Sequence, residues 1–130
     1  MSYDAEYQVL DDHIRIEVSG ERVPGNVAID SSIVMEKTMG LIQESGIRNC
    51  LLVLKLTGPL SAMDSFDIVS ISEEVGWKRD FRVALVNLNA ETLEDAQFTE
   101  IVASNRAYPI RVFGNEEDAK DWLLSMPHKA

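Results

Sequence analysis

The sequence predicts an α/β fold: a five-stranded mixed, mainly parallel sheet with four helices, in the order β-β-α-β-α-β-α-β-α. Two apolar runs, residues 51–54 and 82–86, are too short for surface helices and too continuously apolar for exposed strands. Such runs are typical of strands buried on both faces of a parallel sheet. Each run is followed by a segment with apolar residues at helical spacing, which predicts strand–helix units with crossover helices.

The sheet is expected to begin with an antiparallel hairpin. Residues 7–10 and 14–18 flank a short acidic turn, and apolar and polar residues alternate in the second of these runs. Alternation of this kind indicates a strand with one buried face. Two such strands joined by a short turn pair antiparallel, and this makes the predicted sheet mixed.

The first helix and the central strand follow the break at residues 24–26. The helix has apolar residues on roughly one face and ends at Gly46, since glycine is the common residue just past a helix C-terminus. Asn26 and Asp30 are both suitable N-caps, and the sequence does not decide between them. The central strand covers residues 49–56, and Cys50 at its head is expected to lie in the core.

The second helix has more apolar residues than one narrow stripe requires. Ser61 and Asp64 have the form of a capping box, and the helix then runs to Gly76. Its apolar residues are Met63, Phe66, Ile68, Val69, Ile71 and Val75. Either one side packs on the sheet while the other faces a partner, a ligand or a bilayer, or the helix is well buried. Trp77, just beyond it, suits a half-exposed anchor or a core position.

The last third of the chain repeats the strand–helix pattern twice. A strand over residues 81–88 leads to a helix that opens at Thr92 and continues through Phe98. Residues 110–113 form the last strand, and Asn115 can cap a helix with an acidic first turn. The apolar positions of that final helix are Ala119, Trp122, Leu123 and Met126, with Pro127 as its end.

The composition and charge of the chain argue against nucleic acid as a partner and indicate one domain. The 130 residues carry a net charge of −10, and we expect a single domain over residues 1–130. The acids outnumber the bases 22 to 12, which argues against nucleic acid because phosphate binding needs clustered Lys and Arg. No signal peptide and no apolar run of membrane-spanning length can be recognised, so a cytoplasmic location is expected.

Motifs for catalysis or cofactor binding are not recognisable in the sequence. The two histidines, His13 and His128, stand far apart, and no glycine-rich phosphate loop is present. Cys50 has no histidine placed as an obvious base. We therefore predict a protein without enzymatic activity, cofactor or metal site.

Three runs carry a resemblance to a known family. They are residues 82–86, residues 101–106 and residues 111–123, of which the last is the most specific. With the order of elements, these runs resemble the STAS domain, and within it the SpoIIAA-like branch of bacterial proteins. The resemblance spans nearly the whole chain and implies a mixed sheet beside four helices and no enzymatic activity. It also implies a fold similar to CRAL-TRIO lipid-transfer domains.

The resemblance further directs attention to two serines as phosphorylation candidates. STAS antagonists are switched by phosphorylation of a serine in an Asp-Ser-Ser-Gly type motif at the start of the helix after the central strand. Here Asp64 and Ser65 keep the first pair, but Phe66 and Asp67 replace the second serine and the glycine. The motif is therefore degenerate, and Ser61 fits a helix cap better than a phosphoacceptor.

Two hypotheses of function follow. The first is a non-enzymatic binding module that encloses a small nonpolar or lipid-like molecule between the sheet and the second and third helices, with transient membrane contact. Its candidate ligand-binding residues, expected to be partly exposed or to line a void above about 300 Å³, are Met63, Phe66, Val69, Trp77 and Phe98. The alternative is a STAS-type regulatory module that binds a protein partner, or a second copy of itself as a homodimer, through the helix after Ser61.

Overall fold

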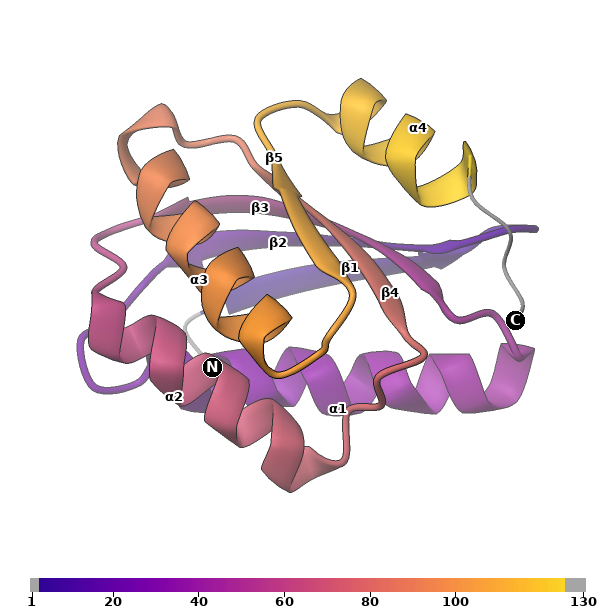
Figure 1. The fold of residues 1–130 in the computed structure, drawn as a ribbon, viewed down its shortest axis with the longest axis horizontal. Helices are drawn as coiled ribbons and strands as arrows, with labels where there is room; N and C mark the ends of the chain where they lie inside the picture. Colours follow the sequence, from indigo (N-terminus) through magenta and orange to yellow (C-terminus); the bar gives the residue numbers. More distant parts are fainter. Residues whose placement is uncertain (1–2, 126–130) are drawn as a thin grey trace.

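The predicted order of strands and helices is confirmed. The computed structural model describes residues 3–125 (Figure 1). Its elements are β1 (Tyr3–Val9), β2 (Ile14–Glu21), α1 (Val27–Ser45), β3 (Asn49–Thr57), α2 (Ala62–Val75), β4 (Arg82–Asn87), α3 (Leu93–Asn105), β5 (Ile110–Phe113) and α4 (Glu116–Ser125), with a 3₁₀ turn at Ala90–Thr92 before α3.

The five strands form one mixed sheet in the order β1-β2-β3-β4-β5. Only β1 and β2 pair antiparallel, with Tyr3 opposite Gly20 and Val9 opposite Ile14, and the other neighbours pair parallel. β1 begins at Tyr3, four residues before the predicted start at residue 7. The reason is that the inward–outward alternation already starts there: Tyr3 is buried and Asp4 is exposed.

The two faces of the sheet are covered unequally. Helices α1, α2 and α3 lie on one face, and α4 alone lies on the other (Figure 1). Successive residues of a strand point to opposite faces. In β3, Cys50 therefore joins the core under α1–α3, while Leu51 and Val53 pack against Ala119 and Leu123 of α4.

Helix α2 packs mainly against other helices rather than against the sheet. It packs against α1 on one side and α3 on the other, and its contacts with the strands are few. Since α1 lies over β1 and β2 and α3 lies over β5, α2 bridges the gap between them above the middle of the sheet (Figure 1).

Local capping chemistry sets the helix ends largely as predicted. Gly46 and Gly76 end α1 and α2 in the left-handed conformation, with φ of 77° and 87°. Ser61 and Asp64 form the predicted capping box, with both bonds at 3.0 Å. Of the two candidate caps of α1, Asn26 occupies the N-cap position, and Asp30 lies one turn inside the helix.

Helix α4 begins as predicted and is held on the sheet by aromatic contacts. The Asn115 Oδ1 accepts a hydrogen bond from the Asp118 backbone N–H at 2.9 Å. The Arg82 guanidinium lies 4.5 Å from the centre of the Trp122 ring, which also packs against Phe113. The expected end of this helix at residues 126–127 lies outside the described residues.

One ion pair links α4 to the hairpin. Arg15 of β2 donates from Nε and Nη2 to the two carboxylate oxygens of Glu116, at 2.8 Å and 2.9 Å. These hydrogen bonds hold the pKa of Glu116 below its usual range. A carboxylate with a lowered pKa stabilises the fold above its unfolded pKa, and this stability is lost as the pH falls through the lower folded value.

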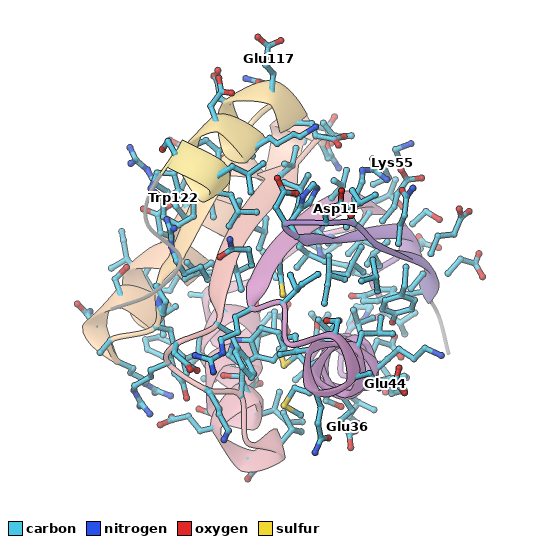
Figure 2. All side chains as sticks on the ribbon, turned by 90° about the vertical axis from the view of Figure 1, so that its right-hand side faces the viewer. Asp11, Glu36, Glu44, Lys55, Glu117 and Trp122 are labelled. Atoms are coloured by element: carbon cyan, nitrogen blue, oxygen red, sulfur yellow. The ribbon has the colours of Figure 1, made fainter. Side chains whose placement is uncertain are left out.

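We therefore predict that Glu116→Gln lowers the free energy of unfolding at pH 7 by up to about 1 kcal/mol, and that the difference from wild type shrinks in acid. Urea denaturation at pH 7 and pH 3 measures both effects. Glu117→Gln is the matched control, because Glu117 shares the acidic first turn of α4 but points away from the body of the protein (Figure 2). Equal losses for the two variants would contradict the role given to Arg15.

Candidate functional site

The apolar residues of α2 divide between its outer and inner surfaces. Met63 and Phe66 point outward and are 66% and 43% exposed, whereas Val69 is only 3% exposed. The Phe98 ring of α3 lies edge-on to Phe66, with ring centres 5.7 Å apart. The structure thus separates the five predicted ligand-binding residues: Met63 and Phe66 face outward, whereas Val69 and Trp77 line the interior.

A second pair of apolar side chains is exposed on the neighbouring helix. Ile29 and Ile33 stand one turn apart in the first half of α1, as Met63 and Phe66 do in α2. Both helices follow strands that run parallel, so they begin at the same end of the sheet (Figure 1). We call these four side chains the outer apolar residues.

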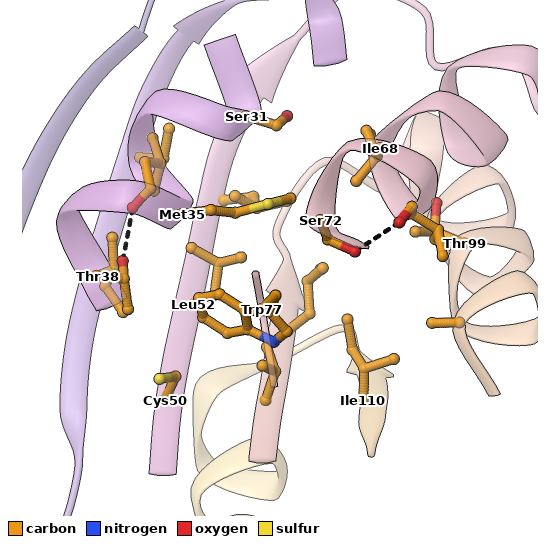
Figure 3. A pocket seen from close by; sticks show the side chains of 18 of the residues that line it. Ser31, Met35, Thr38, Cys50, Leu52, Ile68, Ser72, Trp77, Thr99 and Ile110 are labelled. Carbon is orange, nitrogen blue, oxygen red and sulfur yellow. Dashed lines mark hydrogen bonds between the residues drawn. The ribbon is translucent and has the colours of Figure 1, made fainter. Parts of the chain in front are cut away.

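A partly open cavity of about 160 Å³ lies between the sheet and helices α1–α3. Figure 3 shows Met35 of α1, Leu52 of β3, Ile110 of β5 and Trp77 converging on it, and Val69 also lines it. The sequence predicts that the candidate residues are partly exposed or line a void above about 300 Å³. Met63 and Phe66 are exposed, whereas the cavity lined by Val69 and Trp77 has only about half that volume. Engineered apolar cavities of about 150 Å³ nevertheless bind benzene.

Trp77 occupies an intermediate position between core and surface. Its indole lines the cavity and packs edge-on against Phe81, with ring centres 5.2 Å apart. Part of the residue remains exposed. Both alternatives that the sequence left open for this tryptophan therefore describe a part of its surroundings.

One end of the cavity carries polar side chains. Tyr3 and Arg22 line it and are each 4% exposed, and Asp30, adjacent in sequence to the lining residue Ser31, is 3% exposed. Arg22 donates to the Gly58 carbonyl at 3.0 Å, but the Tyr3 hydroxyl and Asp30 Oδ2 have no hydrogen-bond partner among the described residues. Buried polar atoms normally have partners, so this end of the cavity is unusual.

Burial and neighbouring charges act on the ionisable groups at this end. Burial raises the pKa of Tyr3, which Arg22 lowers and Asp30 and Asp64 raise. Burial also lowers the pKa of Arg22, and Tyr3, Asp64 and Asp95 oppose that shift. Tyr3 therefore remains a neutral phenol near neutral pH and can donate a hydrogen bond.

Sequence reasoning did not select these polar residues. Tyr3 lies before the predicted start of its strand, and Arg22 lies between the predicted hairpin and the break at residues 24–26, where the sequence predicts no element. Asp30 was considered as a helix cap, although it is buried inside the first turns of α1. The alternation of apolar and polar residues extends back to Tyr3, and this pattern was the sequence signal that could have placed Tyr3 in the strand.

The two phosphorylation candidates have contrasting surroundings. Ser61 is exposed and caps α2 through its hydroxyl. Ser65 is fully buried, and its hydroxyl lies 2.7 Å from that of Thr99 on α3. A phosphate on Ser65 would therefore require this helix contact to open.

Other chemistry is sparse within residues 3–125. No group of three or more His, Cys, Asp or Glu residues in this part of the chain could hold a metal ion. No helix in it is long and apolar enough to cross a membrane. Burial raises the pKa of Cys50 to about 12, so this thiol is not a thiolate near neutral pH.

The comparisons with known proteins identify the fold. No family model and no curated protein matches the sequence. Among solved structures, the chain is similar to an anti-sigma factor antagonist from Mycobacterium paratuberculosis, with 13% identity, a TM-score of 0.56 and 94% of each chain covered. It is also similar to an uncharacterised protein with a SpoIIAA-like fold from Shewanella loihica, with 16% identity, a TM-score of 0.56 and 94% coverage of both chains. The fold is therefore a SpoIIAA-like α/β fold, as the sequence predicts.

The two serines yield a prediction about stability. Ser61→Asp should leave the free energy of unfolding within about 0.5 kcal/mol of wild type, since Asp caps helices as well as Ser does. Ser65→Asp should destabilise the protein by about 3 kcal/mol or more, because it buries an unpaired charge. Urea denaturation of both variants tests this, with Ser65→Ala as the control for loss of the hydroxyl alone. A Ser65→Asp protein as stable as wild type would show that this part of α2 opens readily.

Proposed function

We propose that this protein is a non-enzymatic, STAS-type interaction module of the cytoplasm that binds a protein partner through the outer apolar residues. The observation that carries the proposal is the exposure of Phe66 and Met63 at the start of α2. The likeness to an anti-sigma factor antagonist supports a regulatory role.

The chemistry of these side chains suits a docking surface. Aromatic and methionine side chains are enriched at protein interfaces, and Met63 and Phe66 lie exposed near the start of α2. Ile29 and Ile33 are exposed on α1, the helix that packs against α2. Phe98 supports the Phe66 ring from the side, which limits the side-chain entropy lost on binding.

We predict that Phe66→Asp abolishes stoichiometric recovery of a partner by the tagged protein from lysate of the cells that express it. Charge at the centre of an apolar contact typically weakens binding at least a hundredfold, or about 3 kcal/mol. Val9→Asp is the matched control: Val9 is 45% exposed, close to the 43% of Phe66, but lies at the opposite end of the sheet. Binding should then be reconstituted with the purified partner.

The same variants also test self-association. Light scattering across a concentration series would detect a homodimer lost in Phe66→Asp, in which case the partner is a second copy of the chain. Monomers at every concentration, together with no partner or a partner retained by Phe66→Asp, would contradict the proposed docking surface.

The cavity supports a second candidate function, the binding of a small nonpolar molecule. Its lining is almost wholly apolar, and 160 Å³ matches a single ring or a short chain rather than a whole lipid. A membrane contact would be the route by which such a molecule enters. Native mass spectrometry should then show a small adduct on the freshly purified protein, removed by organic extraction and absent from Ala96→Leu, which fills part of the cavity.

A further inference from the structure

The apolar cavity ends in unpaired hydrogen-bonding atoms, and this restricts what it can bind. The Tyr3 hydroxyl and Asp30 Oδ2 are buried without partners, and Arg22 uses one of its five N–H groups on Gly58. A wholly apolar occupant would leave the Tyr3 hydroxyl unsatisfied, which weakens the binding of such an occupant.

The charges near this end of the cavity favour a ligand whose polar group is neutral over one whose polar group is an anion. Arg22 contributes one positive charge, but the carboxylates of Asp30, Asp64 and Asp95 all act on Tyr3 or Arg22. An anion at this end would therefore meet more negative than positive charge. A neutral hydroxyl would not, and it can both accept a hydrogen bond and donate one.

The place of these residues in the sheet agrees with a ligand site. Tyr3 pairs with Gly20 near the end of β2, and Arg22 follows that strand, with its backbone N–H bonded to the Thr57 carbonyl. This is the edge of the sheet formed by the carboxyl ends of the parallel strands, where ligands of open α/β sheets usually bind.

We propose that the cavity binds a small neutral alcohol or phenol, with its ring or chain among the apolar residues and its hydroxyl at Tyr3 and Arg22, which both line the cavity. The hydroxyl accepts a hydrogen bond from the Tyr3 phenol or from the Arg22 guanidinium. The inference rests on the second candidate function and adds the chemical class of the ligand.

Three probes of nearly equal size test the proposal: toluene, benzyl alcohol and benzoate. Calorimetric titration of the full chain measures their dissociation constants for wild type and for Tyr3→Phe. Benzyl alcohol should bind wild type most tightly, and Tyr3→Phe should weaken it about tenfold, which is the loss of one hydrogen bond. Toluene affinity should be the same in both proteins, because toluene does not use the phenol.

Tyr7→Phe is the control variant, since Tyr7 lies on the same strand but does not line the cavity. Tyr3→Phe should also be as stable as wild type, because it removes a hydroxyl without a partner. Benzoate binding most tightly, or an equal effect of Tyr3→Phe on toluene and benzyl alcohol, would overturn the hydroxyl site while the apolar cavity function stands. No binding of any probe would overturn both.

Discussion

The structure depends on how three crossover helices cover one face of a five-stranded sheet. Helix α1 takes the hairpin side and α3 the β5 side, which leaves α2 packed between them with few strand contacts. Close packing is therefore incomplete under α2, and the cavity of 160 Å³ is the consequence. On the opposite face of the sheet, α4 alone covers the apolar side chains, because the hairpin strand β2 carries polar residues such as Arg15 and Glu17 on that face.

In this arrangement α2 has an inner surface and an outer surface, both of which carry apolar side chains. Its inner residues, such as Val69, form a wall of the cavity, and its outer residues, Met63 and Phe66, face solvent. A protein partner and a cavity ligand would thus contact the same helix from opposite sides. The buried Ser65–Thr99 hydroxyl pair joins α2 to α3, and the capping box at Ser61 fixes the start of α2.

The sequence predicts the fold well because local signals set it. Continuous apolar runs predict the parallel strands, and glycines and capping residues predict the helix ends. The candidate site is harder to predict than the fold, because it depends on distances between helices, and no local sequence pattern encodes these distances. The surplus of apolar residues on α2 leaves open whether the helix faces a partner or is well buried, and it does not show that Val69 points inward and Phe66 outward, nor that Ser65 is buried. Tyr3 and Arg22 meet only through the pairing of β1 with β2.

The central claim is that Phe66 serves binding rather than the fold, and the stability of Phe66→Asp tests it most directly. The substitution removes the edge-on contact with Phe98 from a side chain that is already 43% exposed. The free energy of unfolding from urea denaturation should therefore fall by no more than about 1.5 kcal/mol. A loss of about 3 kcal/mol or more, as expected for a core aromatic residue, would show that Phe66 is part of the core and would contradict the proposed docking surface.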